Sequence, residues 1–120
     1  MATSTTFLCV DDESSVLTME KLLLESAGFR VLTASSGSEA LEVFKSQNVD
    51  VVVMDYFMPK MNGIATAKLM KQLKPKIPIL FLSAYNELPG ETLGLAAAWV
   101  KKGEEDPEHF LARLRAFAHA

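Results

Sequence analysis

The 120-residue sequence predicts an α/β fold: a doubly wound, five-stranded parallel sheet with helices on both faces. Short apolar or β-branched runs alternate with segments of helical spacing, and the links between them are short. Strand–helix–strand repetition of this kind forms parallel sheets with right-handed crossovers. The run 49–54 is almost continuously apolar, which is typical of a central parallel strand covered on both faces.

The alternation predicts the order of the elements along the chain. Strands are expected at residues 7–10, 30–33, 49–54, 79–82 and 99–101. Helices are expected at residues 14–27, 36–44, 62–73, 92–98 and from 107 onward. No linker or low-complexity segment interrupts the pattern, so residues 1–120 are expected to form a single domain with a core at about 7–118.

Three helix ends carry recognisable signals. Gly28 follows the first helix as a C-terminal glycine. Ser36 and Glu39 have the spacing of a capping box at the start of the second helix. Asp106 followed by Pro107 indicates an N-cap with proline at the first helical position.

Helical spacing also indicates which side chains share a face. In the first helix one apolar stripe consists of Val16, Met19, Leu23 and Ala27. In the last helix the expected buried stripe consists of Phe110, Leu111, Leu114 and Phe117.

Composition bounds the class of protein. Apolar residues make up 49% and charged residues 22%, which is enough to build a core. The net charge is −3, whereas a surface that binds nucleic acid is normally basic, so no direct nucleic-acid partner is expected. No apolar run approaches the roughly 20 residues that cross a bilayer, and the first residues lack the basic start of a signal peptide. We therefore expect a cytoplasmic protein that does not enter the membrane.

The single cysteine and the two histidines are expected to lie outside any site. Cys9 has no partner for an internal disulfide, and within an apolar run it is expected to be a small buried hydrophobe. His109 and His119 belong to the last helix and are expected at its surface.

Polar residues follow four of the predicted strands. Asp11 and Asp12 follow the first strand, Asp55 the third and Ser83 the fourth, and the fifth ends at Lys101 and Lys102. In open parallel sheets the reactive site lies at the carboxyl ends of the strands. Taken singly, each residue has an ordinary interpretation as a solvated turn or surface charge. Their placement on one edge favours a shared site.

The chemistry of these residues favours a hard cation. Three crowded carboxylates repel one another unless a cation lies among them, and carboxylate oxygens with room for phosphate suit Mg²⁺, with Mn²⁺ as an alternative. A lysine ammonium opposite the metal pairs with phosphoryl oxygens, and a hydroxyl donates a hydrogen bond to another.

From about Phe7 to Phe117 the sequence resembles the response-regulator receiver family, the CheY-like domains of two-component signalling. The motifs are the acidic pair 11–12, the stretch 54–63 (MDYFMPKMNG), the Ser83-Ala84 step and the segment 99–102 (WVKK), in the family's order. The resemblance implies a flavodoxin-like (βα)5 fold with strand order 2-1-3-4-5.

The resemblance also implies residue roles. Asp55 is the expected phosphoacceptor, which attacks a phosphohistidine on a sensor histidine kinase or histidine phosphotransfer protein. Asp12 is expected to ligate Mg²⁺ directly, with Asp11 close by and acting through water. Asp55 itself and the backbone carbonyl of Phe57 are the further expected ligands. Ser83 holds a phosphoryl oxygen. Such transfer needs alignment and charge neutralisation more than covalent work by the protein.

The second phosphate partner is Lys101 or Lys102. We favour Lys102, because that alignment places Trp99 at the family's aromatic switch position, where it moves as Ser83 moves. Phe57 and Tyr85 occupy the positions that flank the attacking water during hydrolysis in the family. They either shield the acyl phosphate or only pack against neighbouring groups.

The sequence departs from the family pattern after the lysine. Gly103 stands where the family usually has a proline, so a trans peptide bond is expected. The segment from Ser83 to Lys102 is shorter than in common members and contains Pro89-Gly90, so the fourth helix is expected to be short or displaced. The face formed by that helix and the fifth strand can mediate homodimer formation or partner docking in the family. The partner mode is therefore open.

Two other classes of function compete with a phosphoacceptor switch, which is not a conventional enzyme. One is an interaction module with a receiver fold that works without phosphorylation; such modules typically lose an acid or the lysine, and none is lost here. The other is an aspartate-nucleophile phosphatase, which has an Asp-x-Asp motif where this chain has Asp11-Asp12-Glu13. The chain ends with the fifth helix, so we expect a stand-alone receiver or the receiver of a longer regulator, with an unknown downstream target.

Overall fold

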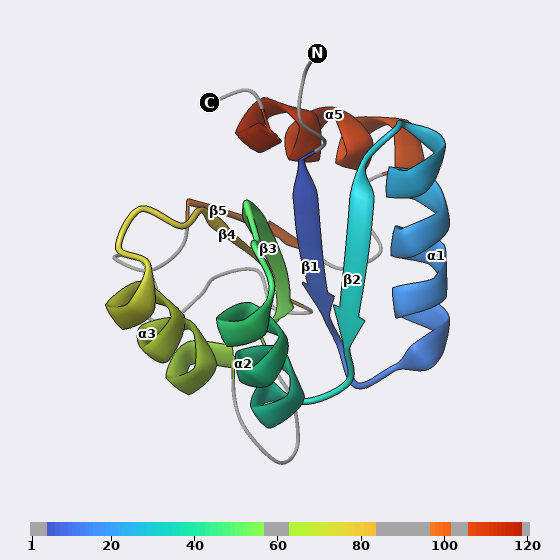
Figure 1. Cartoon of the computed structure of the whole chain (residues 1–120). Coiled ribbons are helices and arrows are strands. Elements are labelled where there is room, and N and C mark those ends of the chain that lie inside the picture. Colours follow the sequence, from blue (N-terminus) through green and yellow to red (C-terminus); the bar gives the residue numbers. More distant parts are fainter. Residues whose placement is uncertain (1–4, 57–62, 84–96, 102–105, 119–120) are drawn as a thin grey trace.

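A computed structural model describes residues 5–56, 63–83, 97–101 and 106–118 of the chain. These residues contain a five-stranded, wholly parallel sheet in the order β2-β1-β3-β4-β5 (Figure 1). The strands are β1 (Thr6–Val10), β2 (Arg30–Ala34), β3 (Val51–Asp55), β4 (Ile79–Ser83) and β5 (Ala98–Lys101). The predicted fold class and strand order are confirmed.

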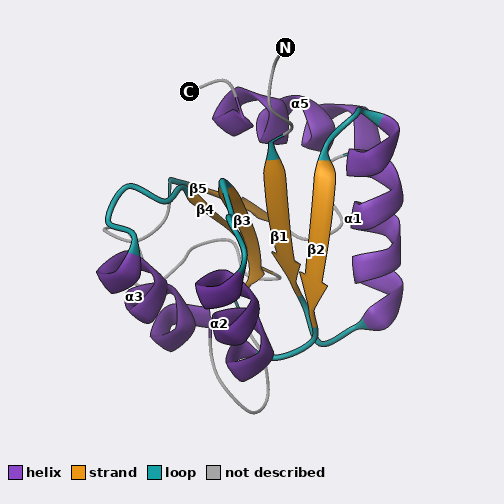
Figure 2. Ribbon diagram, in the orientation of Figure 1, coloured by secondary structure: helices purple, strands orange, loops and turns teal. Residues whose placement is uncertain are grey.

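Helices cover both faces of this sheet (Figure 2). The helices of the described part are α1 (Ser14–Ser26), α2 (Gly37–Ser46), α3 (Gly63–Leu73) and α5 (Pro107–Ala118). α1 and α5 lie on one face, and α2 and α3 lie on the other. The fourth helix, expected at 92–98, falls outside the described residues except for its last positions, where Ala98 already belongs to β5.

The core consists of two apolar layers, one on each side of the sheet. Alternate residues of β1 separate into them because successive strand side chains point to opposite faces. Leu8 and Val10 pack in the layer beneath α2 and α3, whereas Phe7 and Cys9 pack beneath α1 and α5. The five residues of β1 are all buried, as are those of β3 and β4, which is expected for the inner strands of a sheet covered on both faces.

The helix boundaries follow the predicted signals. The Ser36 hydroxyl accepts a hydrogen bond from the Glu39 N–H at 3.2 Å, and the Glu39 carboxylate accepts one from the Ser35 N–H at 2.8 Å. The Asp106 carboxylate accepts a hydrogen bond from the His109 N–H at 2.9 Å and so caps α5. Gly28 has a φ of +92°, the left-handed conformation that ends α1 at little cost only in glycine.

The stripe predicted for α1 is confirmed only in part: Leu23 packs against the layer beneath α1 and α5 while partly exposed. Met19 is 47% exposed, whereas Leu17, Glu20 and Leu24 are buried. The buried face is therefore rotated from the expected stripe by about one residue. The sequence did not predict this buried face because Glu20 lies at its centre. Burying a charged group is costly, so a glutamate is normally assigned to the surface.

In α5 the predicted stripe is partly confirmed. Phe110 and Leu114 are buried, and Leu111 and Phe117 pack against the same layer while partly exposed. None of the described helices is both long and apolar enough to span a membrane. The expectations for Phe57, Tyr85, Lys102 and Gly103 fall on residues outside the described part of the chain.

Candidate metal-binding site

The carboxyl ends of β1, β3, β4 and β5 bring the predicted site residues to one edge of the sheet. Asp11 follows β1 directly, and Asp55, Ser83 and Lys101 are the last residues of β3, β4 and β5. The register keeps these ends level, with Val10 opposite Met54, Asp55 opposite Leu82 and Ser83 opposite Lys101. Asp11 and Asp55, which lie 44 positions apart in sequence, thus come together at this edge.

Three carboxylates gather at this edge. Asp11, Asp12 and Asp55 each offer one oxygen, and these three oxygens lie within 4.8 Å of one another. Asp11 is fully buried and Asp55 is 5% exposed, whereas Asp12 faces solvent. The Asp11 Oδ1 atom accepts a hydrogen bond from the Glu13 N–H at 2.9 Å, which orients its carboxylate.

This donor set fits a divalent cation with oxygen preference. Carboxylates at this separation repel strongly in a buried setting, and a cation among them removes that cost. Mg²⁺ typically takes one or two carboxylates and keeps several other ligand positions for water or phosphate. The exposure of Asp12 leaves one side of the cluster open for such ligands. No second group of this kind occurs among the described residues.

The backbone around Asp55 is held from two sides. Asp55 pairs with Leu82 in the β3–β4 ladder, and the next amide, Tyr56 N–H, donates to the Leu82 carbonyl at 2.8 Å. The Tyr56 carbonyl in turn accepts a hydrogen bond from the Gly63 N–H at 3.1 Å, at the start of α3. The position of the Asp55 side chain therefore depends on both β4 and α3.

Ser83 and Lys101 lie at the same edge. Ser83 is 1% exposed and Lys101 is partly buried, opposite each other in the β4–β5 register. Lys102, the lysine favoured by the sequence motif, falls outside the described residues, so the choice between the two lysines stays a prediction. The same holds for the roles assigned to Phe57 and Tyr85.

Trp99, the predicted switch residue, lies in β5 opposite Phe81. It is partly buried and packs against the layer beneath α2 and α3. The Phe81 ring makes an edge-on contact with Tyr56, with ring centroids 6.1 Å apart. Phe81 thus neighbours both residues, Trp99 as its partner in the β4–β5 ladder and Tyr56 through the ring contact.

A buried acid behind the site was missed by sequence reasoning. Glu20 of α1 is 1% exposed and lies by the thiol of Cys9, in the layer beneath α1 and α5. Burial raises the pKa of the Cys9 thiol well above its ordinary value, and the nearby negative charges of Glu20 and Asp11 raise it further. Cys9 is therefore a protonated core residue, as expected, and not a reactive thiolate.

Comparison with known proteins identifies a family whose sequence pattern this chain matches. The pattern of the response regulator receiver domain family matches residues 7–101. The Bacillus subtilis alkaline phosphatase synthesis transcriptional regulatory protein PhoP is 42% identical over 88 residues, which is 73% of this chain and 37% of PhoP. The chain thus spans little more than a third of that relative.

Solved structures of similar chains show the same fold. The Vibrio cholerae chemotaxis response regulator CheY4 is 32% identical, with a TM-score of 0.87 over 96% of this chain and 99% of CheY4. The Thermotoga maritima response regulator TrrA is 28% identical, with a TM-score of 0.86 over 94% of this chain and 98% of TrrA. TrrA was crystallised in complex with Mg²⁺ and beryllium fluoride.

Proposed function

We propose that this chain, which belongs to the response regulator receiver family, accepts a phosphoryl group on Asp55 and works as a phosphorylation-controlled switch. The observation that carries the proposal is the convergence of Asp11, Asp12 and Asp55 at one edge of the sheet. The Mg²⁺–beryllium fluoride complex of TrrA, a relative of the same fold, supports a metal and a phosphate-like group in such a site.

Asp11, Asp12 and Asp55, with the Phe57 backbone carbonyl, would hold Mg²⁺ or Mn²⁺. When bound, the cation would neutralise the charge that builds up on the phosphoryl oxygens. An Asp55 carboxylate oxygen forms the new bond to phosphorus as the bond from phosphorus to the donor's histidine nitrogen breaks. That nitrogen keeps the electron pair of the broken bond. The product is an acyl phosphate on Asp55 and a free histidine on the donor.

Ser83 and Lys102 would supply the remaining contacts. The Ser83 hydroxyl donates a hydrogen bond to one phosphoryl oxygen, and the lysine ammonium pairs with another. Lys102→Ala should lower the phosphorylation rate strongly, whereas Lys101→Ala should lower it little. The opposite ranking would assign the role to Lys101.

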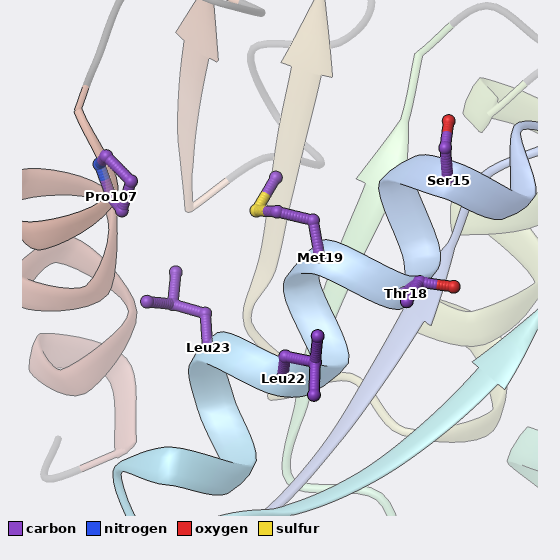
Figure 3. A pocket seen from close by; sticks show the side chains of 6 residues that line it. All are labelled: Ser15, Thr18, Met19, Leu22, Leu23 and Pro107. Carbon is purple, nitrogen blue, oxygen red and sulfur yellow. The ribbon is translucent and has the colours of Figure 1, made fainter.

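The phosphodonor is proposed to be a cytoplasmic sensor histidine kinase or phosphotransfer protein that docks beside the acidic edge. α1 starts just after Asp11 and Asp12, and a groove of about 460 Å³ lies between α1 and the start of α5. Met19 and Leu23 point from α1 toward Pro107 at the start of α5 (Figure 3). Leu22, also at this groove, is 66% exposed. An apolar helix face of the donor would cover these side chains while its phosphohistidine reaches Asp55.

The docking proposal has a direct test. Leu22→Ser should slow phosphorylation by the cognate kinase and leave phosphorylation by the small donor acetyl phosphate unchanged. Leu73→Ser on α3, which alters another half-exposed leucine (53%), is the matched control and should change neither rate. Equal kinase rates for the wild type and Leu22→Ser would refute docking at this groove.

The phosphoacceptor itself is tested by mass spectrometry after incubation with acetyl phosphate and Mg²⁺. We expect an adduct of about 80 Da, the mass of one phosphoryl group, on the peptide that contains Asp55. Asp55→Asn should abolish it, and Asp50→Asn, a carboxylate at the opposite edge of the sheet, should leave it intact. A protein that neither binds Mg²⁺ nor gains the adduct would favour the phosphorylation-independent interaction module.

A further inference from the structure

Gly63, the first residue of α3, makes an unusually close approach to the end of β3. A Cβ atom built at this position would lie 2.8 Å from the Asp55 carbonyl oxygen and 3.1 Å from the Tyr56 carbonyl oxygen. It would also lie 3.1 Å from the Phe81 ring. Favourable contacts between heavy atoms lie at roughly 3.5–4.0 Å, so the space for a side chain is absent here.

None of the three neighbours can retreat easily. The Asp55 carbonyl belongs to a residue paired with Leu82, and the next amide is tied to the Leu82 carbonyl at 2.8 Å. The Tyr56 carbonyl already accepts the Gly63 N–H at 3.1 Å. Phe81 is fully buried among core residues. A side chain at position 63 must therefore displace the start of α3 or the end of β3.

The requirement for glycine at this position is steric and not conformational. Among the described residues, Gly28 is the glycine with a positive φ, and an added Cβ at Gly28 would meet nothing within 4 Å. Gly63 has the opposite combination, an ordinary backbone conformation and no room. A substitution at Gly28 therefore tests backbone strain alone, whereas one at Gly63 tests crowding against Asp55.

We infer that Gly63 is a positioning residue for the Asp55 carboxylate: its missing side chain lets α3 close against the Asp55 backbone and so sets where that carboxylate lies relative to Asp11 and Asp12. The inference rests on the proposed function. The three carboxylate oxygens lie within 4.8 Å of one another, and a metal site tolerates displacements of only about 0.5 Å. A small shift of the Asp55 backbone therefore weakens the site.

The test compares Gly63→Ala with Gly28→Ala in the full chain. Mg²⁺ affinity is measured by calorimetry, the phosphorylation rate with acetyl phosphate, and stability by the urea midpoint. Both variants should lose stability, Gly28→Ala because alanine is strained at positive φ. Gly63→Ala alone should lose Mg²⁺ affinity, by about 10- to 100-fold, as is typical when the support of a metal ligand is changed. Gly28→Ala should keep the wild-type affinity.

Wild-type Mg²⁺ affinity in folded Gly63→Ala would overturn the inference, as would an equal loss in both glycine variants. Where Gly63→Ala does not fold in plain buffer, all three proteins are compared in trimethylamine N-oxide, which favours the compact state. A wild type that binds Mg²⁺ but is not phosphorylated refutes the proposed phosphoacceptor function, while the affinity ratio still decides the role of Gly63. A wild type that binds no Mg²⁺ overturns both.

Discussion

Asp11→Asn should have two effects of opposite sign, because the same carboxylate that would bind the metal destabilises the metal-free protein. Asp11 is fully buried, Asp55 is 5% exposed, and their nearest carboxylate oxygens lie within 4.8 Å. At that distance and an effective dielectric constant of about 20, two unit charges repel by about 3.5 kcal/mol.

The asparagine in Asp11→Asn should keep the local hydrogen bond that the native carboxylate makes. Its side-chain oxygen can still accept the Glu13 N–H hydrogen bond, which is 2.9 Å long in the wild type. We therefore expect Asp11→Asn to raise the free energy of unfolding by about 1–3 kcal/mol without metal. For the wild type, Mg²⁺ at ten times its dissociation constant should add about 1.4 kcal/mol, and the variant should gain almost none of this.

The assay is urea unfolding followed by circular dichroism, in EDTA and in Mg²⁺. Asp50→Asn is the matched control, since it makes the same change of charge at the opposite edge, where the Asp50 carboxylate accepts the Thr6 N–H at 2.8 Å. This control should keep the wild-type response to Mg²⁺. An Asp11→Asn protein that is no more stable than the wild type in EDTA, or that still gains stability from Mg²⁺, would refute the reasoning.

Three further predictions concern stability. The folded state holds the Cys9 pKa above the ordinary value of 9.0, so stability should fall as pH rises past about 9, by up to about 1.4 kcal/mol per pH unit. Urea unfolding between pH 8 and 10 should show a shallower fall for Cys9→Val, and identical slopes would contradict the assignment. Leu114→Ala, at a fully buried position, should cost about 2–5 kcal/mol in urea unfolding. Leu73→Ala, at a position that is 53% exposed, should cost much less, and equal losses would count against the core assignment. Ser36→Ala removes the N-cap of α2 and should lower the free energy of unfolding by about 1 kcal/mol, so an unchanged thermal midpoint would contradict the capping role.

The fold and the edge on which the site lies could be predicted because both depend on short-range signals. The five strands were visible as apolar runs, and the polar residues that end them were visible as breaks in those runs. Parallel pairing then places all these breaks on one side of the sheet. Asp11, Asp12 and Asp55 accordingly lie together as predicted.

The buried face of α1 could not be read from the sequence because its central residue is charged. Apolar spacing favoured Met19, which is 47% exposed, over the true face around Glu20. The thiol of Cys9 lies by that carboxylate, and this contact depends on how α1 packs against β1. No local pattern carries that information.

The role of Gly63 was hidden for a similar reason. In the sequence Gly63 belongs to a motif and marks the start of a helix. Many glycines share these two features, so neither feature indicates that a side chain would be excluded here. Its crowding arises from the carbonyl groups of Asp55 and Tyr56 and the ring of Phe81, which meet only when α3 closes on the sheet. Steric requirements of this kind exist only in the assembled fold.

The central claim, a metal-binding pocket around Asp55, the proposed phosphoacceptor, is tested most directly by titrating Mn²⁺ into ¹⁵N-labelled protein and recording paramagnetic broadening of the amide resonances. The account predicts that the amides of residues 11–13 and 55–56 broaden first, while those of Thr6 and Asp50, at the opposite edge of the sheet, stay sharp. Broadening centred on any other part of the chain, or none at millimolar Mn²⁺, would contradict it.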